Sequence, residues 1–164
     1  MNQCVGCVLV LFLSWFGGAL PAVARPVEKA STRVRGVWMH PGFFGSDKTI
    51  AKEKIQTTLD AYARAGINTL YILVKNTTGH LYYSSEIGVR DQAYDWDFFS
   101  LFLSEAERRK MEVHPWFCVF PETAILGQVG RHPEWLITNP KREMVAVANP
   151  ALPAVRAYEK SLIL

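Results

Sequence analysis

The stretch TLYILV, residues 69–74, decides the fold class of this 164-residue chain. It is a continuous apolar run without the alternation of polar and apolar side chains that a half-exposed strand shows. Strands buried on both faces have such sequences, and parallel sheets are their usual setting. The run therefore predicts a central strand of a parallel sheet.

Strand and helix patterns alternate on both sides of this run. The stretch VRGVWMH, residues 34–40, precedes a Pro-Gly turn signal and predicts a strand. The stretch EVHPWFCVF, residues 112–120, predicts another strand, with a bulge or bend near Pro115 because a proline cannot donate to a central ladder. One helix is expected after a cap at Ser46 or Asp47, and a second after Asp95 or Asp97.

Each predicted helix has apolar or small side chains at the spacing of one helical face. On the first helix these are Ala51, Ile55, Leu59, Tyr62 and Ala63. On the second they are Phe98, Phe99, Phe102, Leu103 and Ala106. A last helix is expected to open at Pro150 and to carry Val155, Tyr158 and Leu162 on one face. Two long segments, a polar loop over 75–94 and a loop up to Asn149, are predicted to lack regular structure.

The order of strands and helices predicts an α/β fold with parallel strands joined by right-handed crossovers. The long loops follow the strands, whereas the returns from helix to strand are short, which is the arrangement of barrel enzymes. The first strand also lacks a glycine-rich dinucleotide fingerprint. We therefore expect the first three β/α units of a (β/α)8 barrel. Because a whole barrel needs ~250 residues, we also expect the chain to be truncated and not independently active.

The first 24 residues have the features of a secretory signal. They carry no charged side chain, and an apolar run from Cys4 to Leu20 precedes Ala22-Val23-Ala24, a pattern that signal peptidase accepts. The run is shorter than the ~20 residues of a spanning helix, which disfavours the alternative of an uncleaved anchor. The prediction is a signal peptide over 1–24, a linker over 25–33 and a barrel part over 34–164. The protein is expected to be secreted or periplasmic, with membrane contact only during export.

Charge and cysteine usage exclude several classes of function. The net charge is +3 with scattered basic residues, so nucleic-acid binding is not expected. Loss of the signal leaves Cys118 as the one cysteine, so a disulfide framework is excluded. Cys118 itself is interpreted as a buried structural thiol. The four histidines lack the spacing of metal-ligand pairs, so neither a metal nor another cofactor is predicted.

Several short motifs, taken in order, resemble the bacterial glycosyl-hydrolase-like 10 family. They are RGVW at 35–38, GINTLY at 66–71, EVHPWF at 112–117, HPEWL at 132–136 and NP at 149–150. The resemblance implies a (β/α)8-barrel envelope or extracellular protein that hydrolyses a polysaccharide or cell-wall glycan. The family's acidic catalytic candidates lie on the next strand, so the resemblance implies that they lie beyond Leu164. A non-catalytic carbohydrate-binding envelope protein on the same fold is the alternative.

Glycoside hydrolysis requires two carboxyl groups across the scissile bond, at the carboxyl ends of strands or on the loops that follow. Glu122 comes two residues after the third predicted strand. It is a candidate general acid or acceptor for a substrate hydroxyl. The alternative, a solvated loop carboxylate, is the favoured interpretation because most loop carboxylates face water.

Five further residues are candidates for substrate contact. His40 ends the first strand, and Lys75 and Asn76 end the second, where a sugar hydroxyl could bind. A lysine that ends an apolar strand must reach the barrel mouth or find a carboxylate partner. His114 and Trp116 share one face of the third strand, with the indole as a platform for a pyranose ring, although both could equally fill core space. Lys75, His114 and Trp116 are predicted to converge on one mouth of the barrel.

Overall fold

A computed structural model describes residues 33–122 and 128–163 of the chain. The predicted signal peptide, residues 1–24, lies outside the described residues, as does the predicted linker apart from Arg33. Within the described residues, none of the helices combines the length and the apolar character needed to cross a membrane.

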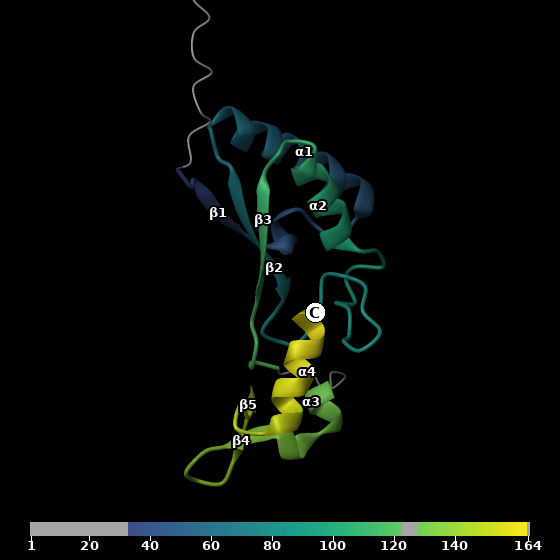
Figure 1. Ribbon diagram of the computed structural model, residues 1–164. Helices are drawn as coiled ribbons and strands as arrows, with labels where there is room; N and C mark the ends of the chain where they lie inside the picture. The colour runs from purple at the N-terminus through teal and green to yellow at the C-terminus, as the bar shows by residue number, and fades with distance from the viewer. Residues whose placement is uncertain (1–32, 123–127, 164) are drawn as a thin grey trace, which may run out of the picture. The chain divides into compact units, whose positions relative to one another are not determined.

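Three parallel strands form the main sheet (Figure 1). They are β1 (Gly36–Met39), β2 (Thr69–Lys75) and β3 (Glu112–Phe117), in the order β1-β2-β3. The register aligns Trp38 with Tyr71 and Tyr71 with His114. The apolar run at 69–74 is therefore the central strand, as predicted, and it is buried at nearly every position.

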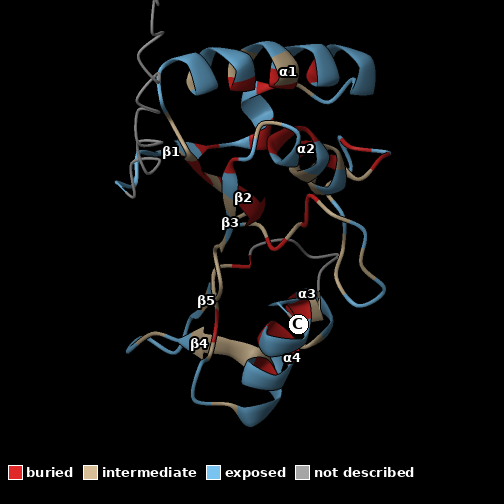
Figure 2. Cartoon of the chain, turned by 45° about the horizontal axis from the view of Figure 1, so that its top comes forward, coloured by how far each residue is buried: buried red, intermediate tan, exposed pale blue. Residues whose placement is uncertain are grey.

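Helices α1 (Lys48–Arg64) and α2 (Phe98–Glu107) pack on one face of this sheet, and both direct their buried residues toward it (Figure 2). The Asp47 and Asp97 carboxylates cap them by accepting from the N–H groups of Ile50 and Ser100 at 2.9 and 2.8 Å. Both predicted helices are confirmed. Ala63 is nevertheless exposed, and the carboxylate of Glu105 is buried beside the apolar face.

Aromatic rings fill the space between helices and sheet. Phe44, Phe98 and Phe102 are fully buried and lie within about 6 Å of one another, ring centre to ring centre. The segment between β2 and α2 contributes Tyr82 and Tyr94, which are buried against Phe98. The predicted loop is confirmed, because residues 76–94 form neither a helix nor a strand. Its description as polar is wrong, because Tyr82 and Tyr94 belong to the core.

The bulge expected near Pro115 lies on the neighbouring strand. The register between β2 and β3 shifts by one residue between Leu73 and Lys75, opposite Trp116 and Phe117. Strand β3 also ends at Phe117 instead of reaching residue 120. Proline is tolerated here because β3 is an edge strand of the three-stranded sheet.

The part of the chain over residues 128–148 contains regular structure, in contrast to the loop predicted up to Asn149. It contains α3 (Gln128–Arg131), the 3-10 turn η2 (Pro133–Trp135) and an antiparallel pair, β4 (Leu136–Thr138) and β5 (Met144–Ala148). Strand β4 has only three residues, too few for a periodic signal. Helix α4 (Pro153–Ile163) follows and buries Val155, Tyr158 and Leu162 as expected, but begins at Pro153 instead of Pro150.

Candidate functional site

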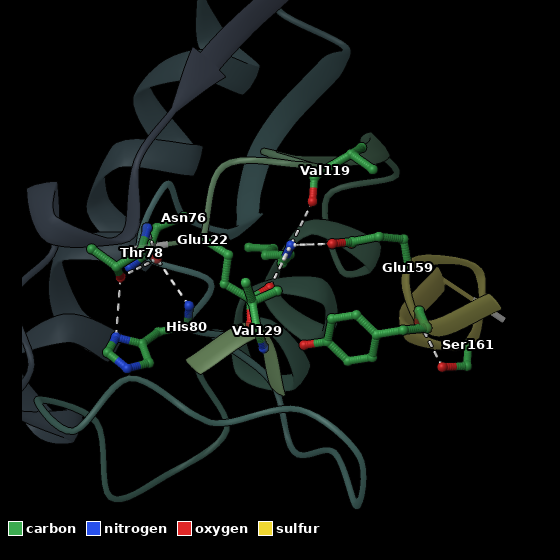
Figure 3. A network of polar contacts seen from close by, with 10 residues as sticks. Asn76, Thr78, His80, Val119, Glu122, Val129, Glu159 and Ser161 are labelled. Carbon is green, nitrogen blue, oxygen red and sulfur yellow. Dashed lines mark hydrogen bonds and ion pairs between the residues drawn. The ribbon is translucent and has the colours of Figure 1, made fainter. Parts of the chain in front are cut away.

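Three charged side chains meet where β2 ends, and we call them the strand-end cluster: Lys75, Glu122 and Glu159. The Lys75 ammonium lies 2.9 and 3.0 Å from the two carboxylate oxygens of Glu159 and 3.3 Å from Oε2 of Glu122. It also donates to the Val119 carbonyl at 2.6 Å. Figure 3 shows Val119, Glu122 and Glu159 directed toward this one nitrogen. All three charged residues are buried.

Each member comes from a different part of the chain. Lys75 is the last residue of β2, Glu122 follows β3, and Glu159 lies on α4. The interpretation of Glu122 as a solvated loop carboxylate is wrong, because its side chain is fully buried against Lys75. The carbon chain of Glu122 packs on Gly79, where even a methyl group would overlap it. Lys75 thus has the carboxylate partners that its place at the end of an apolar strand requires.

Glu159 is the member that sequence reasoning missed. Its signal is the helix spacing: it lies four residues after Val155 and three before Leu162, on the face of α4 that is otherwise apolar. A carboxylate at such a position needs a buried partner. Glu105 on α2 shows the same pattern and is held by Arg109 at 3.0 Å.

Burial dominates the electrostatics of the cluster. Burial raises the pKa of Glu159, the ammonium of Lys75 opposes this increase, and the charge of Glu122 adds to it. Two tyrosines face the same region. Burial raises the pKa of Tyr83 to about 12, and the pKa of Tyr158 is also raised, by burial and then by the charge of Glu122. Both phenols therefore stay neutral in neutral solution.

The face of the sheet opposite α1 and α2 carries four rings, which we call the aromatic face: Trp38, Tyr71, His114 and Trp116. The Trp38 ring stacks on Tyr71 at 4.7 Å and meets Trp116 edge-on at 5.2 Å. Tyr71 in turn stacks on His114 at 5.2 Å. Trp38 is 64% exposed, and Nε1 of Trp116 is buried without a hydrogen-bond partner among the described residues.

The predicted convergence of Lys75, His114 and Trp116 at one mouth is wrong for His114. The register places His114 opposite Tyr71, four residues before Lys75 along β2. Its Nε2 lies 3.0 Å from Glu112, at the start of β3. Trp116 is the penultimate residue of its strand and thus lies nearer the carboxyl end.

The side chain of Asn76 organises the turn after β2. Its carbonyl oxygen accepts from Thr78 and His80, and its amide donates to Tyr82 and Asp91, both at 3.2 Å. Every polar atom of Asn76 is therefore engaged within the chain. Asn76 and His80 are labelled in Figure 3 beside the strand-end cluster.

His40 lies at the carboxyl end of β1 and is exposed. Its Nδ1 accepts from the N–H of Gly42 at 3.2 Å and caps the 3-10 turn η1 (Pro41–Phe43). The neutral ring therefore carries its proton on Nε2.

Cys118 is half-buried, not fully buried as expected. Residues 33–122 and 128–163 contain no group of three or more His, Cys, Asp or Glu side chains that could hold a metal ion.

The sequence pattern of the family named glycosyl hydrolase-like 10 matches residues 33–163, which is nearly the whole described chain. The chain belongs to this family. The resemblance in the short motifs is thereby confirmed. No curated protein matches the chain significantly.

Solved structures share the fold of this family member at low sequence identity. A hypothetical protein from Ruminiclostridium thermocellum has a TM-score of 0.58 at 17% identity, over 77% of this chain and 70% of that one. Alpha-L-fucosidase isoenzyme 2 from Paenibacillus thiaminolyticus has 0.55 at 18% identity, over 74% of this chain and 18% of that one. An alpha-amylase from Lactobacillus plantarum has a TM-score of 0.55 at 13% identity, over 79% of this chain and 35% of that one. The TM-scores show a shared fold of the mixed α/β kind, in spite of the low sequence identity.

Proposed function

We propose that this chain is part of an exported (β/α)8-barrel glycoside hydrolase that acts on a polysaccharide or cell-wall glycan. The family match over residues 33–163 carries the proposal. The likeness in fold to an α-L-fucosidase and an α-amylase supports it. The parallel β-α-β-α-β order with helices on one sheet face is what the first units of such a barrel require. Export is proposed from the apolar run and the Ala22-Val23-Ala24 pattern.

We place the glycan contact at the carboxyl end of the aromatic face. Trp38 and Trp116 are the penultimate residues of their strands, and their rings touch. Barrel enzymes bind substrate at this end of the sheet. The exposed Trp38 ring offers a platform for a pyranose, and the unpartnered N–H of Trp116 can donate to a sugar hydroxyl. Tyr71 and the exposed His114 lie on the same face, earlier along their strands.

The strand-end cluster holds charged side chains in fixed positions at this end of the sheet. Lys75 holds Glu122 and Glu159 at contact distance, and the Val119 carbonyl completes its hydrogen bonds. Glu122 is proposed as the carboxyl that acts on substrate as an acid or hydroxyl acceptor, with Lys75 as its positioning residue. The catalytic partner of Glu122 would come from outside residues 33–163.

The test is hydrolysis by the purified protein with the rest of the proposed barrel present, on a panel of polysaccharides and cell-wall glycans, measured as new reducing ends. The expected result is turnover of at least one glycan. Glu122→Gln should lower kcat and leave binding intact, while Trp38→Ala should weaken binding about tenfold, the equivalent of ~1.4 kcal/mol. Met144→Ala, which changes an exposed side chain on β5, serves as the control and should alter neither.

A non-catalytic carbohydrate-binding protein is the second candidate. The observation that favours it is the burial of Glu122 and Glu159 around Lys75, which keeps both carboxyl groups from solvent. In that case a glycan would bind without release of reducing ends, and Trp38→Ala would still weaken binding. Absence of both binding and turnover across the panel would contradict both candidates.

A further inference from the structure

The hydrogen bonds of Lys75 are unequally divided between its two carboxylates. An ammonium group has three hydrogens. The Val119 carbonyl and the two oxygens of Glu159, at 2.6, 2.9 and 3.0 Å, provide three acceptors. Oε2 of Glu122 lies 3.3 Å from the same nitrogen, in ion-pair contact but outside hydrogen-bond geometry.

Glu122 is correspondingly short of donors. Its Oε1 accepts from the N–H of Val129 at 3.3 Å, and its Oε2 is buried with no hydrogen-bond partner among the described residues. A buried ionised oxygen without a donor is costly, whereas a neutral carboxylic acid in the same place loses far less solvation energy.

The charge balance leads to the same conclusion. With both carboxyls ionised, the cluster would combine two negative charges with the single positive charge of Lys75 in a buried volume. Burial and the charge of Glu122 both raise the pKa of Glu159, so the two carboxyls resist ionising together. Their titration therefore belongs to the pair.

We propose that the Glu122–Glu159 pair keeps one proton in neutral solution, so that the strand-end cluster is an electrically neutral, proton-holding lock between the end of β2 and α4. The hydrogen bonds place this proton on Glu122, because both oxygens of Glu159 accept from Lys75. The inference concerns the cluster alone and stands whether or not the protein cleaves a glycan.

The neighbouring titratable groups are Tyr83, Tyr158 and His80. The two phenols face the cluster from the β2–α2 segment and from α4, and both have raised pKa values, so they stay neutral below strongly basic conditions. His80 follows Gly79, on which Glu122 packs, and its Nδ1 lies 3.1 Å from the Thr78 hydroxyl. Because His80 lies beside the residue on which Glu122 packs, it requires its own control.

The lock predicts a definite direction of pH dependence. If the pair binds one proton more in the folded state than in the unfolded state, stability is highest below the unfolded carboxyl pKa and is lost as pH rises toward the folded value. Over that interval, one proton changes the folding equilibrium about tenfold per pH unit. Above the folded value, the cluster carries a net negative charge and α4 is held less firmly.

The experiment measures urea unfolding of the full chain between about pH 5 and pH 9 for the wild type, Glu122→Gln, Glu159→Gln and His80→Gln. A neutral amide replaces the neutral acid in Glu122→Gln, so we expect the one-proton slope to be lost and the variant to be more stable than the wild type at neutral pH. Glu159→Gln should lower stability throughout, because it removes both acceptors of Lys75. His80→Gln should keep the slope. Equal slopes in the wild type and Glu122→Gln would overturn the proposal.

An infrared measurement tests the proposal without depending on how any variant folds. In the wild type near pH 7, we expect the carbonyl band of a protonated carboxylic acid, which disappears when the pH is raised. In Glu122→Gln this band should be absent. A wild-type spectrum with no protonated carboxyl near pH 7 would refute the proton-holding lock.

Discussion

The chain contains two regions that are held together by different forces. From β1 to β3, helices α1 and α2 bury apolar side chains against the sheet, and the fully buried rings of Phe44, Phe98 and Phe102 pack there with aliphatic residues. The part of the chain after β3 is held by two small apolar clusters, one in which Tyr158 and Leu162 pack on Leu81 and one around Val129. The buried ion pair of Glu159 with Lys75 adds to them. The first region depends on area removed from water, and the second depends heavily on one lysine. A region held by a buried ion pair is more sensitive to pH and to single substitutions than a region held by apolar packing.

The largest effect is expected in the aromatic core. Phe98→Ala removes a fully buried ring that lies near Phe44, Tyr94 and Phe102. We expect a loss of about 3–5 kcal/mol in the free energy of unfolding, measured in urea, because a cavity is added to the lost burial. The control is Phe43→Ala, an adjacent ring position that is 65% exposed, where a change within about 0.5 kcal/mol is expected. Similar losses in both variants would contradict a core centred on Phe98.

The second prediction concerns the ion pair that fastens α4. Lys75→Met leaves two buried carboxyl groups without their cation and should reduce the free energy of unfolding by about 3 kcal/mol. Hydrogen exchange distinguishes the two regions: amides of α4 should exchange faster in Lys75→Met, while amides of α2 should stay protected. Lys160→Met, which changes an exposed lysine on the same helix, is the control and should leave exchange unchanged. Uniform loss of protection would mean that the two regions form one cooperative unit.

Two glycines allow the packing of Glu122 to be isolated. Gly79 and Gly45 both have φ of +88°, so alanine at either position costs about 1–3 kcal/mol from the backbone alone. At Gly79 the added methyl would overlap the Glu122 side chain, whereas at Gly45 nothing lies within 4 Å. Gly79→Ala should therefore destabilise the protein more than Gly45→Ala in thermal unfolding. Equal shifts would show that Glu122 does not pack on this turn.

Smaller effects are expected at the helix caps of the apolar region. Asp97→Ala removes the cap of α2 and a contact at 2.8 Å to the N–H of Ser84, and should cost about 1–2 kcal/mol. Asp47→Ala removes only the cap of α1 and should cost about 1 kcal/mol. Burial tends to raise the pKa of Asp97, but hydrogen bonds from Ser100 and Ser84 lower it overall. The contribution of Asp97 should therefore vanish as pH falls through its depressed folded pKa, which acid titration of both variants can check.

The sequence predicts the two regions unequally, and the reason is physical. The run at 69–74, the helix faces and the aspartate caps are local patterns, so the sheet with its two helices could be derived from them. The hairpin of β4 and β5 has a short strand and a turn at Arg142 with φ of 63°, which local propensity does not indicate. The buried aromatics between β2 and α2 were hidden among polar neighbours.

The site was predictable only in part for the same reason. Lys75 was expected to find a carboxylate or reach the barrel mouth, and its position at the end of an apolar strand was sufficient for that inference. Its partner Glu159 is 84 residues away along the chain, so only the spacing on α4 could have indicated it. The depth of His114 depends on a register that strand patterns do not fix. The sequence alone does not predict which polar groups far apart along the chain pair with one another.

Glycan binding at the carboxyl end of the aromatic face can be tested through the indole N–H resonances in ¹⁵N NMR. A glycan that the hydrolysis panel shows to be bound or cleaved is titrated into the labelled protein. We expect the signals of Trp38 and Trp116 to shift. Those of Trp96, whose N–H donates to the Ser46 carbonyl at 2.8 Å, and of Trp135 after α3 should stay in place. Shifts at Trp96 or Trp135 with none at Trp38 and Trp116 would contradict glycan binding at the aromatic face.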